Sequence, residues 1–296
     1  MTCFHPLSAY RTDGGEIIFN NRHKNIRESL KLPCGQCVGC RLERSRQWAI
    51  RCVHEAQMHT DNCFITLTYR DADLPYNYSL DVREFQLFMK KLRKKYGSGI
   101  RFYHCGEYGS QFGRPHYHAC LFNFDFPDKE LWQVRDNVRL YVSESLSEIW
   151  GKGFCTIGEV TFESAAYVAR YIMKKVNGDA ANEHYEFIHP HTGEIIQRKP
   201  EYTTMSRRPG IGSTWFDKYG ADVYPADRVI MRGKSMRPPK FYDNKFEILN
   251  PDLFEEIKFK RHLDSLKHAD NNTSDRLKTR ETVQNLALQR LPRNLI

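Results

Sequence analysis

The sequence predicts an α+β protein with a central antiparallel sheet and helices packed against it. Two observations lead to this prediction. Short runs rich in β-branched and aromatic residues recur between residues 61 and 160, which is typical of strands. Stretches with apolar residues at helical spacing separate these runs. The resulting order, β-α-β-β-α-β followed by a further helix, predicts the split-βαβ or ferredoxin-like fold with a four-stranded antiparallel sheet.

The individual elements follow from local composition. The expected strands are residues 64–69, 100–105, 116–122 and 154–160. One expected helix, residues 81–95, begins with Asp81 and ends in Lys and Arg before Gly97, which are typical helix boundaries. The other expected helices are residues 41–59, most of 129–150, and 163–176, which the following Asn177 and Gly178 would end.

Composition divides the chain into four parts. Residues 1–60 are basic, contain clustered cysteines and are expected to end in a helix, whereas residues 61–180 carry the strand and helix pattern of the core. Periodicity fades in residues 181–250, where His, Pro, Arg and Tyr are frequent, so this part is expected to be an irregular basic extension. Residues 251–296 predict a charged tail of two helices.

Composition also restricts the function. Lys and Arg total 45 among 296 residues against 36 Asp and Glu, which gives a formal net charge of +9, and 13% of the residues are aromatic. This composition favours a polyanionic partner, above all nucleic acid. No apolar run approaches the ~20 residues of a membrane span, and no signal-peptide pattern opens the chain, so we expect a soluble protein without a membrane partner. Nine cysteines, an odd number, without a sign of secretion indicate a reducing cytoplasm.

His116 and His118 are the first candidate chemical residues. Residues i and i+2 of a strand project from the same face, so both imidazoles can reach one metal ion. Glu107 follows the neighbouring expected strand and would lie near the histidines if the two strands pair as a hairpin. Two imidazoles and a carboxylate leave coordination positions open, as a catalytic metal site requires. The alternative is two ordinary strand histidines and a loop carboxylate paired with Arg114.

Tyr167 and Tyr171 are the second candidate group. Their spacing places both on one face of a helix, with Lys174 nearly one turn beyond Tyr171. A tyrosine hydroxyl has a reference pKa near ~10 and therefore attacks poorly at neutral pH. A metal that polarises a phosphate, together with a nearby cation, would make the attack feasible. The alternative is an aromatic stripe that belongs to the core.

The order of these motifs resembles that of the HUH endonucleases, which nick single-stranded DNA in rolling-circle replication. Three segments carry the resemblance: residues 64–69 (FITLTY), 114–122 (RPHYHACLF) and 167–174 (YVARYIMK). Within that superfamily the chain resembles the replication initiators of gokushovirus-type microviruses, which are small single-stranded DNA bacteriophages. This closer similarity rests on the opening CFHPL, on residues 33–48 and on residues 105–109 (CGEYG). The middle residue of the His-x-His motif is Tyr117 here rather than an aliphatic residue, which leaves both ligands in place.

The resemblance implies a metal-dependent nickase. Mg²⁺ or Mn²⁺ would be bound by Glu107, His116 and His118. Tyr167 or Tyr171 would attack the scissile phosphate, become linked to the 5′ phosphate and free a 3′-hydroxyl that primes replication. Two tyrosines would allow one to hold the parental 5′ end while the other cuts the regenerated origin.

The resemblance also implies partners and a place of action. The DNA partner would be a single-stranded origin, and the basic residues expected to contact it are Arg114, Lys175, Arg207 and Arg208. Residues 233–235 (GKS) lack the earlier glycine of a phosphate-binding loop, so unwinding would need a host helicase along with the host replication machinery. The protein would act in the cytoplasm of the bacterial host cell.

Two other functions stay open at this point. A non-catalytic nucleic-acid-binding module could use the same fold with structural His and Tyr residues. An HUH nickase could instead serve transposition or plasmid transfer. The resemblance of the cysteine-rich N-terminal segment favours phage replication over these two.

Cys34, Cys37 and Cys40 have the spacing of a zinc-binding segment. Three thiolates need a fourth ligand to complete a tetrahedral site. The candidates for this ligand are Cys3, His5, Cys52 and His54. A structural Zn²⁺ and a set of free thiols are both compatible with the sequence.

Overall fold

The computed structural model describes residues 3–22, 25–109, 112–135, 138–170, 176 and 180–290, and every structural statement below concerns these residues. The chain divides into two compact units. The larger unit is residues 45–246, and the smaller unit combines residues 1–44 with 247–296. The smaller unit therefore contains both the clustered cysteines and the C-terminal tail.

The larger unit is built on an antiparallel sheet that has seven strands over the described residues, in the order β12-β5-β6-β4-β9-β8-β7. Its strands are β4 (Asn62–Leu67), β5 (Arg101–Tyr108), β6 (Pro115–Phe122), β7 (Glu130–Arg135), β8 (Val138–Val142), β9 (Cys155–Gly158) and β12 (Tyr202–Met205). The four strands predicted from the sequence are the contiguous set β5-β6-β4-β9. The predicted α+β class, with an antiparallel sheet and flanking helices, is confirmed.

The prediction of a mostly helical segment at residues 129–150 is wrong. β7 and β8 form an antiparallel hairpin there, and only the end of the segment forms a helix, α3 (Glu144–Trp150). The alternating, β-branched sequence of this stretch suits a pleated surface, and β8 gains pairing with β9 between Tyr141 and Ile157. The helix begins where the Ser143 hydroxyl accepts a hydrogen bond from the backbone N–H of Leu146.

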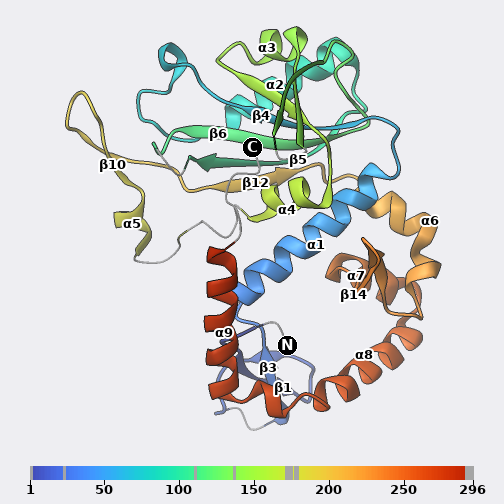
Figure 1. Cartoon of the computed structure of the whole chain (residues 1–296). Coiled ribbons are helices and arrows are strands. Elements are labelled where there is room, and N and C mark those ends of the chain that lie inside the picture. Colours follow the sequence, from blue (N-terminus) through green and yellow to red (C-terminus); the bar gives the residue numbers. More distant parts are fainter. Residues whose placement is uncertain are drawn as a thin grey trace. The chain divides into compact units, whose positions relative to one another are not determined.

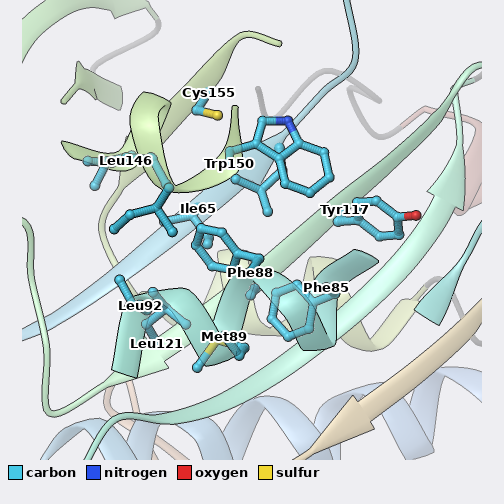
Figure 2. Close-up of a cluster of buried hydrophobic side chains, with 14 of the residues drawn as sticks. Ile65, Phe85, Phe88, Met89, Leu92, Tyr117, Leu121, Leu146, Trp150 and Cys155 are labelled. Atoms are coloured by element: carbon cyan, nitrogen blue, oxygen red, sulfur yellow. The ribbon is translucent and has the colours of Figure 1, made fainter. Parts of the chain in front are cut away.

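Helices α2 (Val82–Tyr96) and α3 cover one face of the sheet (Figure 1). α2 begins at Asp81, whose side chain accepts a hydrogen bond from the backbone N–H of Arg83. The apolar stripe of α2 packs on strand residues of this face (Figure 2): Phe85, Phe88, Met89 and Leu92 lie among Ile65, Tyr117 and Leu121. Burial of each such side chain contributes about 1.5–3 kcal/mol relative to exposure, so this cluster is the main core of the larger unit.

Helix α4 (Phe162–Arg170) and the second half of α1 (Val38–Ala56) cover the opposite face. Small and apolar residues of these helices form one buried cluster with strand residues: Ala49, Cys52, Ala165, Val168 and Ala169 with Phe64, Cys105, Cys120 and Phe122. Side chains alternate along a strand. His116 and His118 therefore point to the same face as Cys120, and this is the face that α4 covers.

The rest of the larger unit consists of short elements. They are the 3₁₀ turn η1 (Asp71–Asp73), α5 (Ala180–His184), β10 (Glu186–Ile188), β11 (Ile195–Gln197), α6 (Ser213–Val223), β13 (Val229–Met231), β14 (Lys234–Met236) and the start of α7 (Lys240–Leu249). β10 pairs with β11, and β13 pairs with β14, as antiparallel hairpins. Residues 181–250 are therefore richer in regular structure than their weak periodicity indicates.

The smaller unit contains a three-stranded sheet with the order β2-β1-β3 over its described residues. Its elements are β1 (Leu7–Thr12), β2 (Ile17–Ile18), β3 (Ile26–Leu32), the first turns of α1, α8 (Pro251–Leu266), η3 (Asp270–Asn272) and α9 (Ser274–Gln289). The predicted helical tail is confirmed by α8 and α9, with the break between them at the expected place. Across the described part of the chain, no helix combines the length and apolar character that a membrane crossing needs.

Candidate active site

Glu107, His116 and His118 meet on the face of the sheet that α4 covers. β5 and β6 are paired so that Glu107 lies opposite His116, and Cys105 lies opposite His118. Oε1 of Glu107 is 2.9 Å from Nε2 of His116 and 2.8 Å from Nε2 of His118. One ligand atom from each of the three residues lies within 4.8 Å of the other two. The strand pairing thus assembles the carboxylate and two imidazoles that the sequence predicted to be neighbours.

Two further contacts orient the imidazoles. Nδ1 of His118 is 3.0 Å from the Thr66 hydroxyl, because β4 pairs with β6 so that Thr66 lies opposite His118. Nδ1 of His116 is 3.1 Å from the backbone carbonyl oxygen of Arg114. A carbonyl oxygen only accepts hydrogen bonds, so Nδ1 of His116 must carry the proton, and a neutral ring then turns the lone pair of Nε2 toward Glu107. Such contacts are the usual way in which metal-binding histidines are held.

The charge of Glu107 is fixed by its neighbours. Its side chain is only 2% exposed, and burial by itself raises the pKa of a carboxyl group. Hydrogen bonds from His116 and His118 outweigh burial and lower the pKa of Glu107 to about 2. The group therefore stays ionised at neutral pH. An ionised carboxylate and two imidazole lone pairs directed at one point form a donor set that fits a divalent cation.

Tyr167 brings α4 to this group. Its hydroxyl donates a hydrogen bond to Oε1 of Glu107 over 3.3 Å. The Tyr167 ring meets His118 edge to face, with ring centroids 5.1 Å apart, and lies near Phe64 at 6.5 Å. Ala165, which faces the sheet on the same helix, is fully buried, whereas Tyr167 is partly exposed. The hydroxyl is thus directed at the predicted metal ligands instead of being enclosed in the core.

The other predicted site residues fall into two groups. Tyr171, Lys174 and Lys175 lie outside the described residues. Arg114 lies next to the site, but its guanidinium forms an ion pair with Asp71 and donates to the carbonyl of Tyr69. The alternative in which Arg114 neutralises Glu107 is therefore not what the structure contains.

Arg207 and Arg208 are not brought to the Glu–His–His group. Both are exposed in the turn that follows β12. There the backbone N–H of Ser206 bonds to the carbonyl of Phe102, at the opposite end of β5 from Glu107. Five strand residues separate Phe102 from Glu107, which corresponds to about 17 Å. A contribution of the two arginines to DNA binding stays a prediction.

Four cysteines cluster in the smaller unit. The sulfur atoms of Cys3, Cys34, Cys37 and Cys40 all lie within 4.8 Å of one another, so Cys3 is the fourth member of the predicted group. Backbone N–H groups donate to these sulfurs, with Phe4 N at 3.3 Å from Cys37 Sγ and Cys34 N at 3.2 Å from Cys3 Sγ.

The thiols of this cluster are not equivalent. Burial raises the pKa of the Cys37 thiol, but the N–H donors of Phe4 and Cys40 and the neighbouring thiols outweigh it and lower the pKa to about 6. Burial raises the pKa of Cys3 and of Cys40. Backbone N–H groups directed at sulfur stabilise thiolates, which are the metal-binding form of cysteine.

The other candidates for a fourth ligand are engaged elsewhere. Cys52 belongs to the buried cluster under α1 and α4, and Nδ1 of His54 is 2.9 Å from the Tyr242 hydroxyl. His5 is paired with Glu281.

Two residues of these sites, Thr66 and Cys3, were missed or left undecided by sequence reasoning. Thr66 stands two positions after Phe64 in an expected strand, so alternation alone places it on the α4 face. Its pairing with His118, however, depends on a strand register that local sequence does not specify. Cys3 is separated from the other cysteines by the three-stranded sheet, so only the fold selects it.

Comparisons with known proteins agree with this geometry. The sequence model of the replication-associated protein ORF2 family matches residues 62–176, which run from β4 past α4. Replication-associated protein VP4 of Bdellovibrio phage phiMH2K is 32% identical over 278 residues, which cover 90% of this chain and 83% of that protein. Replication-associated protein ORF2 of Spiroplasma virus 4 is 33% identical over 289 residues, 88% of this chain and 86% of that protein.

A third relative is similar over a shorter stretch. Replication-associated protein ORF4 of Chlamydia phage 1 is 35% identical over 179 residues, which cover 57% of this chain and 43% of that protein. No solved structure matches the chain. The predicted resemblance to microvirus replication proteins is confirmed, and the chain belongs to the family of phage replication-associated proteins.

Proposed function

We propose that this protein initiates rolling-circle replication by nicking and religating single-stranded DNA at an origin. The observation that carries the proposal is the position of the Tyr167 hydroxyl, 3.3 Å from the Glu107 carboxylate that two imidazoles also contact. A nucleophile next to a buried set of metal ligands is the arrangement that phosphoryl transfer requires. Membership in a family of phage replication-associated proteins supplies the biological setting.

Glu107, His116 and His118 would hold Mg²⁺ or Mn²⁺. The bound cation would supply charge neutralisation at the scissile phosphate and so lower the barrier to attack on phosphorus. Thr66 and the Arg114 carbonyl would keep the two imidazoles oriented toward the shared point. The carboxylate of Glu107 would also orient the Tyr167 hydroxyl through their hydrogen bond.

The reaction of the chain's own residues is a transesterification. The Tyr167 oxygen forms a bond to phosphorus, its proton leaves to solvent, and the bond between phosphorus and the 3′ oxygen breaks. The products are a 5′-phosphotyrosine and a DNA strand with a free 3′-hydroxyl. One phosphodiester replaces another, so religation by the reverse reaction needs no ATP.

Tyr171 and Lys174 complete the proposed machinery. Tyr171 follows Tyr167 by four residues and would act as the second nucleophile, so that one tyrosine holds the parental 5′ end while the other cuts the new origin. Lys174 would supply a cation to the phosphate. Arg114, Lys175, Arg207 and Arg208 would contribute to binding of the DNA backbone, since phosphate contacts come mainly from Lys and Arg.

Within the cell, the proposed enzyme would act in the cytoplasm of the bacterial host together with a host helicase and the host replication machinery. The cysteine cluster would have a separate, structural role. We infer that Cys3, Cys34, Cys37 and Cys40 hold Zn²⁺, because four sulfur ligands at this mutual spacing form a closed tetrahedral set. Leu277 of α9 packs against the cluster, so the metal would tie both ends of the smaller unit together.

The test is covalent adduct formation. The wild-type protein is incubated with a labelled single-stranded origin oligonucleotide and Mn²⁺, and adducts are resolved on denaturing gels with and without EDTA. We expect an EDTA-sensitive adduct that is lost in the double variant Tyr167→Phe/Tyr171→Phe and retained in Tyr219→Phe, a matched tyrosine variant outside the site. Mass spectrometry of the DNA-linked peptide identifies the nucleophile.

The alternative functions predict different results. Reversible binding without any adduct would identify a non-catalytic module. An undiminished adduct in the double variant would remove the tyrosine assignment. A chain that cuts transposon or plasmid-transfer sequences and not the phage origin would be a nickase with another biological role.

A further inference from the structure

A groove with an aromatic lining lies in the larger unit beside the predicted metal ligands. It has a volume of about 670 Å³, and its lining includes Tyr78, Phe112, Arg114, Phe187, Ile188 and His191. These residues come from the segment after η1, from the loop between β5 and β6, and from the β10–β11 hairpin, which projects from the end of the sheet (Figure 1). Phe112 is 72% exposed and Ile188 is 67% exposed. Exposed apolar side chains gathered around a groove indicate a ligand with flat apolar faces.

We propose that this groove binds unpaired bases of the DNA strand that the protein cuts, a role that rests on the proposed nicking function. Unpaired bases expose both π-faces and stack on aromatic side chains, whereas duplex DNA hides these faces in its own stack. A groove lined by three aromatic rings from three separate segments suits the first state of DNA and not the second.

The aromatic rings are held in place by neighbours that leave the groove open. The Tyr78 ring packs on Phe187 with centroids 4.9 Å apart and meets His189 edge to face at 5.5 Å. Tyr78 has a φ of 48°, a left-handed conformation that residues other than glycine rarely adopt. The surrounding contacts therefore impose the orientation of this ring, as is often found where residues bind ligands.

The hairpin wall of the groove is tied to the strand that carries the histidines. Arg198, which follows β11, donates a hydrogen bond to the carbonyl of Gly113 over 3.1 Å. Its guanidinium lies over the ring of Tyr108 at 4.3 Å and over the ring of Phe187 at 4.7 Å. This cation between two rings fastens the hairpin to the β5–β6 loop and adds positive charge near the groove.

The groove is also close to the proposed reaction centre. Arg114 lines the groove, and its carbonyl oxygen accepts the hydrogen bond from Nδ1 of His116. Two residues of chain span at most about 7 Å, so a strand in the groove would pass within a few nucleotides of the metal ligands. The groove would thus position the DNA next to the scissile phosphate.

The test measures DNA binding in EDTA, where the nicking chemistry plays no part. Two fluorescein-labelled probes are used: a dT20 oligonucleotide and a strand of 20 abasic units, which keeps the phosphates but lacks the bases. Phe112→Ala is compared with the wild type and with Phe259→Ala, a matched exposed phenylalanine of α8. Stacking of one base is worth about 1–3 kcal/mol, so Phe112→Ala should weaken dT20 binding by about 5-fold or more.

The expected pattern separates stacking from other effects. Phe112→Ala should lose affinity for dT20 but not for the abasic strand, Phe112→Trp should retain affinity for dT20, and Phe259→Ala should behave as the wild type. An equal loss on both probes, or no loss on dT20, would overturn the proposal for the groove. Adduct formation by the wild type is scored separately, so failure of the groove and failure of the nicking function give different results.

Discussion

The hydroxyl of Tyr167 donates a hydrogen bond to Oε1 of Glu107 over 3.3 Å, although the two residues are 60 positions apart in the chain. One lies on a helix and the other on a strand of the sheet that the helix covers. The same carboxylate oxygen is within 2.9 Å of two imidazoles. This single oxygen therefore connects the three predicted metal ligands with the predicted nucleophile.

Replacing Glu107 by Gln should abolish metal binding at the site. The amide has the shape of the carboxylate but lacks its charge. Loss of groups that only orient ligands costs about 10–100-fold in metal affinity, so loss of the ligand itself should cost at least about 100-fold. Titration calorimetry with Mn²⁺ measures this change, with Glu148→Gln, at an exposed position, as the control. Unchanged Mn²⁺ affinity in Glu107→Gln would show that the carboxylate is not a ligand.

Thr66→Val should weaken metal binding without removing a ligand. The substitution keeps the β-branched shape but deletes the hydroxyl 3.0 Å from Nδ1 of His118, so the ring loses its orienting partner. We expect a loss of about 10–100-fold in Mn²⁺ affinity. Thr66→Ser should restore most of the affinity because it returns the hydroxyl. If Thr66→Ser and Thr66→Val bind Mn²⁺ equally, the hydroxyl does not position the histidine.

Cys3→Ser should remove Zn²⁺ and destabilise the smaller unit. Elemental analysis of the purified wild type is expected to give one Zn²⁺ per chain, and the variant much less, because the tetrahedral set loses one of its ligands. A strong chelator should lower the unfolding temperature of the wild type and have little further effect on Cys3→Ser. Cys155→Ala, at a buried cysteine outside the cluster, is the control and should keep its Zn²⁺. Wild-type protein purified without any zinc would contradict the assignment.

Acid should destabilise the larger unit through His54. Burial lowers the pKa of His54 to about 3, against an unfolded value of about 6.5. Between these values the unfolded chain binds more protons than the folded one, so stability is lost as the pH falls below about 6.5. The loss approaches about 1.4 kcal/mol per pH unit for this residue.

The measurement is the free energy of unfolding by urea between pH 7 and pH 5. His54→Gln should show a shallower decline than the wild type, whereas His262→Gln, at an exposed histidine, should show the same decline. His104 contributes to the acid sensitivity in all three proteins, because burial also lowers its pKa. Parallel curves for the wild type and His54→Gln would mean that His54 does not become charged on unfolding in this range.

Local sequence determined much of this protein. Strand alternation placed His116 and His118 on one face, and the helical stripe of α2 identified Phe85, Phe88 and Leu92 as core residues, because these patterns depend only on the backbone period. The same reasoning failed at residues 129–150, where composition suits a hairpin but no Gly or Pro interrupts a helix. There the pairing of β8 with β9 decided the structure, and a neighbouring strand is not visible in a local window.

Tertiary structure alone decided which distant residues meet. The register of β5 against β6 brings Glu107 opposite His116, the register of β4 against β6 brings Thr66 opposite His118, and a shift of one residue would turn each of these side chains to the other face. The choice of Cys3 depends likewise on the folded three-stranded sheet that separates it from Cys34. Chemistry-bearing residue types are thus visible in the sequence because they are local, whereas the site itself is a set of long-range distances that only packing and strand pairing create.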